Sequence, residues 1–327
     1  MRAVICKAYG PPESLVVEDV PAPVPAKGQV LIDVAASGVN FPDVLIIQNK
    51  YQLKPALPFS PGAEVAGRVA ALGEGVTGLK IGDRVIASTA WGGFAEQVVA
   101  DAIRLIPVPD GMPFTTASAF TLTYGTSHYA LKDRAQLKPG ESLLVLGAAG
   151  GVGLSAVEIG KVMGARVIAA ASSADKLEIC RQHGADEVID YGREDLRERL
   201  KALAPNGVDV IYDPVGGAYS EPALRSIAWE GRFLVIGFAA GDIPKIPLNL
   251  TLLKGCQIVG VFWGSFITRS PEHNRANLQE LMNWYLAGKI KPLVSKEYPL
   301  EQAAHALNDL AERKVKGKIV LVTGKAT

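Results

Sequence analysis

The spacing of apolar residues changes character along the chain. Up to about residue 122, short apolar runs are separated by glycine and proline turns, which predicts strands at 13–20, 29–35, 64–72 and 84–88. From 123 to 262, apolar runs near 142–147, 165–170, 187–190, 208–212, 232–237 and 257–262 alternate with helical stretches such as 175–183 and 194–203. The first pattern predicts a partly closed β domain, and the second predicts an α/β domain with a doubly wound parallel sheet.

The last part of the chain departs from the βα alternation. Helices are predicted at 275–287 and 300–313, followed by a strand at 318–322 that we expect to rejoin the first domain. The predicted division is therefore a first domain over 1–122, the α/β domain over 123–262 and a return to the first domain over 263–327. A chain of 327 residues fits this arrangement, since it exceeds the usual size of a single core.

Composition limits the classes of partner. The net charge of +1 and the lack of a basic run predict no nucleic-acid partner, and no apolar run approaches the ~20 residues of a membrane span. A strand-like pattern begins at Ala3, without the features of a signal peptide. Cys6, Cys180 and Cys256 are too far apart for a disulfide framework or a common metal motif, so we expect a reducing, cytoplasmic location.

A glycine cluster between a strand and a helix is the main functional signal. The apolar run 142–146 ends in Gly147-x-x-Gly150-Gly151-x-Gly153, a helical pattern follows, and a second strand begins near residue 165. This is the βαβ unit of a dinucleotide site, in which the helix N-terminus receives the pyrophosphate. We therefore predict cofactor contacts from Ala149, Gly150, Gly151 and Val152. A glycine-rich turn without a ligand is the alternative.

Six ordered motifs carry a family resemblance over essentially the whole chain. They are the segments 38–43 (GVNFPD), 61–67 (PGAEVAG), 82–85 (GDRV) and 93–96 (GFAE), the glycine turn, and 213–217 (DPVGG). With them the chain resembles the zinc-independent quinone oxidoreductase (zeta-crystallin-like) branch of the medium-chain dehydrogenase/reductase superfamily. The resemblance implies a GroES-like catalytic domain, a Rossmann domain and NADPH in the cleft between them. It also implies a homodimer or homotetramer joined through the last Rossmann strand, here 257–262.

The resemblance also bears on metal chemistry. The catalytic zinc ligands of zinc-dependent relatives match Asn40, Ala63 and Leu122 here, and these are poor or impossible zinc ligands. The lobe that holds a structural zinc is missing as well, because Ser88 runs almost directly into Gly92. We therefore predict no metal and a conjugated acceptor, since quinones and enones give anions that hydrogen-bond donors can stabilise without a Lewis acid.

The end of the second Rossmann strand indicates which nicotinamide cofactor binds. NAD-specific domains carry an acidic residue there, and this chain has Ala171. Ser172, Ser173 and Lys176 follow and could bind a 2′-phosphate, although Asp175 beside the lysine complicates this interpretation. A helix N-cap with a solvated lysine is the alternative, and it is compatible with phosphate binding. We predict NADPH; by resemblance, Tyr191 and Arg313 also lie at the adenosine phosphate.

The resemblance nominates two catalytic residues, Asn40 and Tyr51. The amide of Asn40 is expected to face the nicotinamide ribose and the substrate, or else to satisfy the backbone of a turn. Tyr51 matches an aromatic residue of the quinone pocket, where its hydroxyl could donate to the developing oxyanion; packing of its loop is the alternative.

Further cofactor contacts are expected around the nicotinamide ring. Thr126 matches a position that contacts nicotinamide, although it could instead cap a following helix. The ends of the last two Rossmann strands are expected to hold the carboxamide and to line the cleft, through Gly237, Phe238, Phe262 and Trp263.

Three functions follow from these observations. The first is an NADPH:quinone oxidoreductase acting by direct hydride transfer. The second is an NADPH-dependent C=C reductase of enones, alkenals or acryloyl-type thioesters. The third is an NADPH-binding protein with a structural or regulatory role. The sequence leaves open the physiological acceptor and its pathway, dimer against tetramer, and one-electron against two-electron quinone reduction.

Overall fold

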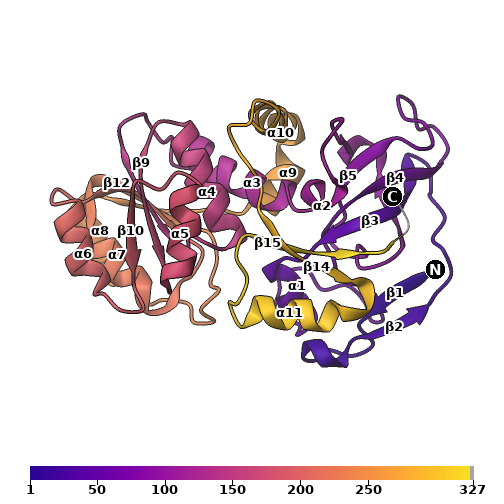
Figure 1. Ribbon diagram of the computed structural model, residues 1–327, viewed down its shortest axis with the longest axis horizontal. Helices are drawn as coiled ribbons and strands as arrows, with labels where there is room; N and C mark the ends of the chain where they lie inside the picture. Colours follow the sequence, from indigo (N-terminus) through magenta and orange to yellow (C-terminus); the bar gives the residue numbers. More distant parts are fainter. Residues whose placement is uncertain (325–327) are drawn as a thin grey trace. The chain divides into compact units, whose positions relative to one another are not determined.

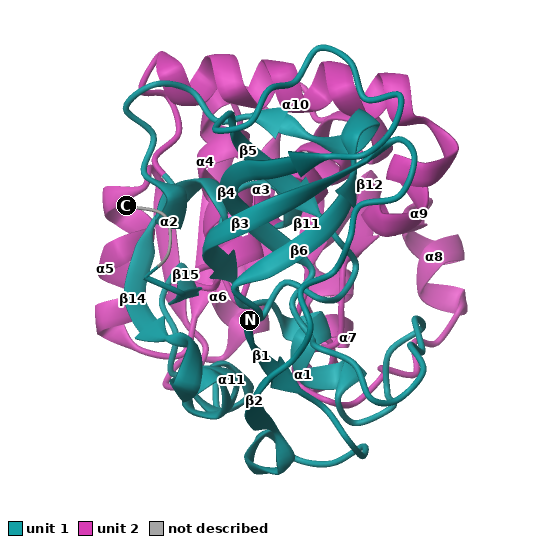
Figure 2. Ribbon diagram, turned by 90° about the vertical axis from the view of Figure 1, so that its right-hand side faces the viewer, with its two compact units in different colours: residues 1–122, 292–327 teal, residues 123–291 magenta. Residues whose placement is uncertain are grey.

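The chain folds into two compact units. The structure, a computed structural model, describes residues 1–324. Figure 2 shows unit 1, which comprises Met1–Leu122 and Pro292–Thr327, and unit 2, which comprises Thr123–Lys291. The first predicted boundary coincides with this division, whereas the predicted return to the first domain at residue 263 differs from the observed one at Pro292.

Unit 1 is built on one sheet of seven strands, in the order β14-β15-β3-β4-β5-β7, with β6 also paired to β3. The pairing of β15 with β3 is antiparallel and brings Val320 opposite Gly38, so the last strand does rejoin the first domain as predicted. The strands are β3 (Gln29–Gly38), β4 (Glu64–Leu72), β5 (Arg84–Ser88), β6 (Gln97–Asp101), β7 (Ile106–Pro107), β14 (Val294–Pro299) and β15 (Lys318–Val322).

Short elements surround this sheet. A separate antiparallel pair is formed by β1 (Arg2–Ile5) and β2 (Val16–Asp19). The predicted strand 13–20 is shorter than expected, because Pro12–Ser14 forms a 3-10 turn after Pro11 and β2 begins only at Val16. The helices of unit 1 are α1 (Phe41–Ile46), α2 (Phe114–Ala117) and α11 (Ala303–Ala311).

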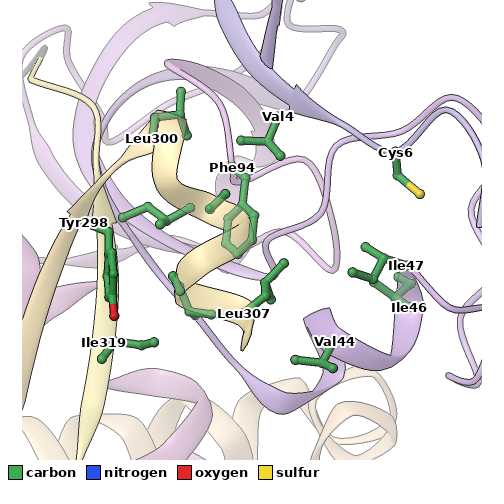
Figure 3. Packing of buried hydrophobic residues seen from close by; sticks show 14 of the residues in the cluster. Val4, Cys6, Val44, Ile46, Ile47, Phe94, Tyr298, Leu300, Leu307 and Ile319 are labelled. Carbon is green, nitrogen blue, oxygen red and sulfur yellow. The ribbon is translucent and has the colours of Figure 1, made fainter. Parts of the chain in front are cut away.

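An apolar cluster packs α1 against α11. Figure 3 shows Val44, Ile46 and Ile47 from the α1 segment in the same cluster as Leu307 of α11 and Ile319 of β15. Each of these side chains is at most 4% exposed. Burial of such side chains contributes roughly 1.5–3 kcal/mol each. The cluster therefore fixes the segment after Asn40 and the start of β15 in one rigid body.

Unit 2 is a doubly wound domain. Its six strands lie in the order β10-β9-β8-β11-β12-β13, and every neighbouring pair is parallel. This confirms the predicted parallel-sheet fold. Chain order reverses at β8, and open α/β sheets bind ligands outside the carboxyl ends of the strands at such a point. The strands are β8 (Ser142–Leu146), β9 (Arg166–Ala171), β10 (Glu187–Asp190), β11 (Val208–Asp213), β12 (Ile227–Val235) and β13 (Gln257–Gly260).

Helices cover both faces of this sheet (Figure 1). They are α3 (Thr121–His128, which begins in unit 1), α4 (Gly151–Val162), α5 (Ala174–Gln182), α6 (Leu196–Leu203), α7 (Ser220–Arg225), α8 (Asn249–Lys254), α9 (Trp263–Arg269) and α10 (Pro271–Leu286). A π-helical turn, Tyr129–Arg134, continues α3. No helix within residues 1–324 combines the length and the apolar character that a membrane crossing requires.

Helices α9 and α10 explain why the second boundary differs from the prediction. The ring of Phe266 in α9 stacks on that of Tyr129 in the π-helical turn, with centroids 4.1 Å apart. In α10, Asn277 Nδ2 donates to Asp133 Oδ2 at 2.7 Å. These contacts join residues about 140 positions apart in sequence, so apolar periodicity could not assign the two helices to unit 2.

Candidate functional site

The glycine turn of unit 2 has the geometry of a close backbone approach. A Cβ added to Gly153 would lie 2.3 Å from the carbonyl oxygen of Gly147 and 2.8 Å from Ala148 Cα, so only glycine fits there. Gly147 itself has φ +58. Gly150 is the N-cap of α4, and an added Cβ would meet its nearest neighbour at 3.4 Å, an ordinary contact. The turn thus places the first amides of α4 directly after β8, as a pyrophosphate site requires.

A cluster of buried hydroxyl groups holds the first turn of α4. Ser127 Oγ donates to the carbonyl of Val152 at 2.9 Å and lies 2.8 Å from both Ser155 Oγ and Tyr212 Oη. All three hydroxyl-bearing residues are at most 1% exposed. This cluster could not be predicted from the sequence, because its members lie in two different helices and a strand. The first N–H groups of a helix have no partner within that helix, and in α4 these include the N–H groups of Gly151 and Val152.

Polar side chains predicted to bind the 2′-phosphate lie together after β9. The position at which NAD-specific domains carry an acidic residue is occupied by Ala171, which is buried. It therefore offers no carboxylate to a ribose hydroxyl. Lys176 Nζ donates to Ser172 Oγ at 3.3 Å, and Ser173 Oγ donates to Asp175 Oδ1. Ser173 is the N-cap of α5, as the alternative proposed, yet its side chain makes no capping hydrogen bond. The arrangement gathers an ammonium and two hydroxyls at one strand end.

The other predicted adenosine contacts lie in different units. In unit 2, the ring of Tyr191 lies 4.4 Å from that of Tyr219 at an interplanar angle of 39°. Arg313 belongs to unit 1, where it follows α11 in a left-handed conformation with φ +57. Tyr191 thus stays beside the strand ends of unit 2, and the assignment of Arg313 to the phosphate stays a prediction.

Residues predicted near the nicotinamide show distinct environments. Thr126 lies within α3, so the alternative that it caps a following helix is wrong. Trp263 is 8% exposed, its Nε1 donates to Asn274 Oδ1 at 3.2 Å, and its indole lies against Gly125. Phe262 is 54% exposed. Trp263 therefore belongs to the packing of unit 2, while Phe262 is accessible.

Gly237 and Phe238 follow β12 at the carboxyl end of the sheet. The amide of Gly237 approaches the carbonyl of Asp213 at 3.4 Å, a long hydrogen bond. Phe238 lies beside Gly216 in the DPVGG segment. The Asp213 carboxylate orders that segment, because its Oδ1 accepts from the amides of both Val215 and Gly216 at 2.8 Å.

A network of buried polar groups surrounds Asn40 in unit 1. Asn40 is the N-cap of α1 and is 4% exposed. Its Nδ2 donates to the Gly38 carbonyl at 3.1 Å and approaches Glu64 Oε2 at 3.4 Å, and its Oδ1 accepts from Lys318 Nζ. Lys318 Nζ also donates to the carbonyl of Val39 at 2.7 Å. Asn40 thus satisfies local backbone, as the alternative proposed, and is also bound to charged groups that the sequence analysis did not connect with it.

Two carboxyl groups complete the network. Glu64 Oε1 accepts from Thr121 Oγ1 at 2.7 Å and from the amide of Leu122 at 2.9 Å. Asp43 accepts from the amide of Asn40 at 2.8 Å and from that of Gly62 at 3.2 Å. These contacts tie segments 40–43, 62–64 and 121–122 to one another and to β15.

The protonation of this network follows from its burial. Burial raises the pKa of the Asp43 carboxyl to about 7, against the lowering effects of the Asn40 amide and the Lys318 ammonium. Burial also lowers the pKa of Lys318, while Glu64 and Asp43 act in the opposite direction. Because burial outweighs these lowering effects, Asp43 is protonated more readily than an exposed carboxyl group.

Tyr51 is half-buried beside the same part of unit 1. It packs against the apolar cluster that includes Val44 and Ile47. Burial raises the pKa of its hydroxyl, and the negative charge of Asp43 adds to the effect. Tyr51 is therefore a neutral hydrogen-bond donor at physiological pH, which suits the predicted role and is equally compatible with loop packing.

The residues at the zinc position do not fit a divalent cation. Asn40 offers an amide oxygen that already accepts from an ammonium, and Ala63 and Leu122 offer no side-chain donor. Among residues 1–324, no three His, Cys, Asp or Glu side chains group as a possible metal site. A second cation beside Lys318 would also be repelled.

Comparison with known proteins places this geometry in a family. Residues 26–110 match the alcohol dehydrogenase GroES-like domain, and residues 151–285 match the zinc-binding dehydrogenase domain. A quinone oxidoreductase-like protein 2 homolog of Nematostella vectensis is 39% identical, with 98% of this chain and 89% of the relative covered.

Solved structures give the same result. The chain is similar to Escherichia coli quinone oxidoreductase complexed with NADPH, at TM-score 0.92 and 30% identity, over 99% of this chain and 100% of that one. It is also similar to the CurK enoyl reductase, at TM-score 0.89 and 27% identity, over 98% of both chains. The β-rich unit 1 is thereby a GroES-like domain, as predicted.

Proposed function

Because the chain belongs to the quinone oxidoreductase branch of the medium-chain dehydrogenase/reductase superfamily, we propose that it is a zinc-independent, NADPH-dependent quinone reductase. One observation carries the proposal: the side chain of Asn40, which matches a zinc-ligand position, is an amide whose oxygen accepts a hydrogen bond from the Lys318 ammonium. Hydrogen-bond donors can stabilise a delocalised oxyanion without a metal ion, whereas a Lewis acid such as zinc is suited to lowering the pKa of an unactivated alcohol.

The residues of the chain would act by positioning. Bound NADPH supplies the hydride that reduces the acceptor. The Gly147–Gly153 turn would receive the pyrophosphate on the first amides of α4, and the Ser172, Ser173 and Lys176 group would bind the 2′-phosphate. Tyr51 would donate a hydrogen bond to the oxygen on which negative charge develops. Holding two reactants in the correct orientation lowers the barrier substantially without covalent catalysis.

Reduction of conjugated C=C bonds is the second candidate function. The similarity to an enoyl reductase favours it, and the same donors would stabilise an enolate. An NADPH-binding structural or regulatory protein is the third. We propose to assay NADH and NADPH against 1,2-naphthoquinones, enones and simple ketones. Turnover of simple ketones would contradict the proposed preference for conjugated acceptors, and NADPH binding without any turnover would favour the third function.

Replacement of Lys176 tests the cofactor assignment. We expect Lys176→Ala to raise the KM for NADPH about tenfold or more, because hydrogen bonds to charged groups contribute roughly 1.5–3 kcal/mol. The KM for NADH should change little. Steady-state kinetics with both cofactors measure this, and Lys201→Ala, an exposed lysine on α6, is the control. Equal effects on NADPH and NADH would contradict the phosphate assignment.

The edge of the unit 2 sheet tests the proposed homodimer. Within the described chain β13 pairs only with β12, and exposed apolar residues lie near it, among them Ile258 at 40% and Leu252 at 80% exposure. An unpaired apolar strand edge is a pairing surface. We expect Ile258→Lys to convert the dimer to monomers in sedimentation equilibrium. Ile81→Lys, at an exposed site of unit 1, should leave the assembly unchanged.

A further inference from the structure

A lysine of the last strand, Lys318, is buried in contact with the side chain of the candidate catalytic residue Asn40. Lys318 is 5% exposed, and the proposed mechanism assigns it no role. Its ammonium makes two contacts with the same short segment, to the Val39 carbonyl and to Asn40 Oδ1. Burial of an ammonium costs free energy unless the ammonium is paired and hydrogen-bonded. The position of Lys318 therefore calls for an explanation of what its charge contributes.

The ammonium determines the orientation of the Asn40 amide. An ammonium is only a donor, so the atom that it contacts must be the amide oxygen. Nδ2 then points toward two acceptors, the Gly38 carbonyl and Glu64 Oε2. A flipped amide would place its NH2 group against the ammonium and its oxygen against a carbonyl and a carboxyl oxygen. All three contacts would become unfavourable, so Lys318 locks one of the two orientations.

One of the two hydrogens of the Asn40 amide is only weakly hydrogen-bonded within the protein. The contact of Nδ2 with the Gly38 carbonyl, at 3.1 Å, is an ordinary hydrogen bond. The contact with Glu64 Oε2, at 3.4 Å, is beyond the usual range for N–H···O bonds. Glu64 is itself held by Thr121 and Leu122 through its other oxygen. The hydrogen directed toward Glu64 is therefore the one that a reacting oxygen could use.

We propose that Lys318 is a positioning residue, whose buried ammonium fixes the Asn40 amide as a hydrogen-bond donor for the reduction of the acceptor. The inference rests on the proposed function and deepens it, because it assigns a role in the zinc-independent site to a cationic side chain of the protein, the Lys318 ammonium. Asp43 and Glu64 offset the charge of this cation, and the apolar cluster of α1, α11 and β15 holds the strand from which it extends (Figure 3).

A double-mutant cycle tests the proposal. We expect Lys318→Met to lower kcat about tenfold or more, with the Kd of NADPH nearly unchanged, because the side chain acts through Asn40 and not through the cofactor. Asn40→Ala should lower kcat at least as much. The double variant should be no slower than Asn40→Ala alone, since Lys318 has nothing left to orient. Additive losses of kcat would overturn the proposal.

Stability needs separate controls. Thr323→Val, five residues after Lys318 in the chain, removes a buried hydroxyl that bonds the Val34 carbonyl of β3. It should lower the melting temperature and leave kcat intact. If Lys318→Met behaves like this control, Lys318 is merely structural and the proposal fails. Lys318→Arg retains a donor-only cation and should recover part of kcat, which keeps the test valid if Lys318→Met folds poorly.

The failure of the proposed function can be distinguished from that of this inference. If the wild-type protein reduces neither quinones nor enones with NADPH, the proposed function fails. The same cycle measured as unfolding free energy then reports the coupling between Lys318 and Asn40, and zero coupling refutes the positioning itself. If the wild type is active and Asn40→Ala has no effect on kcat, the positioning role in turnover is refuted while the reductase function stands.

Discussion

Gly153→Ala is expected to disrupt the cofactor site with the smallest possible side chain. Its Cβ would lie 2.3 Å from the Gly147 carbonyl oxygen, so the turn or α4 must move. Overpacking of this kind costs about 1–3 kcal/mol, and a displacement of about 1 Å in a positioning element can cost on the order of 100-fold in rate. We therefore expect a lower melting temperature and a roughly 100-fold lower kcat/KM for NADPH.

Gly150→Ala is the matched control for this prediction. The position is the extended N-cap of α4, and the added Cβ meets its nearest atom at 3.4 Å. The fold should therefore keep its melting temperature. If the pyrophosphate approaches this backbone closely, NADPH binding should nevertheless weaken. Calorimetric titration and thermal unfolding separate the two effects. A Gly153→Ala protein with wild-type stability and NADPH affinity would contradict the assignment of this turn.

Local patterns predicted the regular elements well. The strands at 64–72, 84–88, 187–190 and 318–322 have the predicted bounds, because apolar runs ended by turn residues specify them locally. Helix α1 was missed because no local pattern specifies it. It has only six residues and contains Pro42, so no helical period can develop. Its conformation is stabilised by packing against α11, a contact between distant parts of the sequence.

The glycine turn and the polar group after β9 could be predicted because each is encoded within a few residues. The network at Asn40 could not, because Lys318 lies 278 residues further along the chain. As the last of three lysines before the apolar run Ile319–Val322, with Lys314 and Lys316, it has the appearance of a solvent-exposed strand end. Only the antiparallel pairing of β15 with β3 brings it beside Asn40. Asn40 could therefore be predicted from the family resemblance, whereas its buried ammonium partner could not.

The buried carboxyl of Asp43 is expected to make the protein less stable as the pH rises. Most carboxylates have the opposite effect on the free energy of unfolding. Its pKa is about 7 in the folded chain and about 3.9 in an unfolded one, so the folded state holds an extra proton between these values. The stabilisation is fully present below about pH 4 and is lost as the pH rises through about 7. Between pH 5 and pH 8 the loss amounts to about 3 kcal/mol, at roughly 1.4 kcal/mol per pKa unit.

Asp43→Asn should remove this loss, because its amide stays neutral at every pH. The variant is expected to be less stable than wild type at pH 5, where one amide hydrogen faces a backbone N–H donor, from Asn40 or from Gly62. Its unfolding free energy relative to wild type should then rise by about 3 kcal/mol from pH 5 to pH 8. Urea unfolding at four pH values measures this difference.

Asp186→Asn is the control for the pH experiment. Burial raises the pKa of Asp186, but hydrogen bonds from Lys161 and the Val167 amide outweigh it and leave the pKa lowered. Stability from a carboxyl of this kind is present above the unfolded pKa and is lost only as the pH falls below about 4. The Asp186→Asn difference should therefore stay flat from pH 5 to pH 8. An equally flat difference for Asp43→Asn would contradict the prediction, because it would show that Asp43 stays ionised in the folded protein over this pH range.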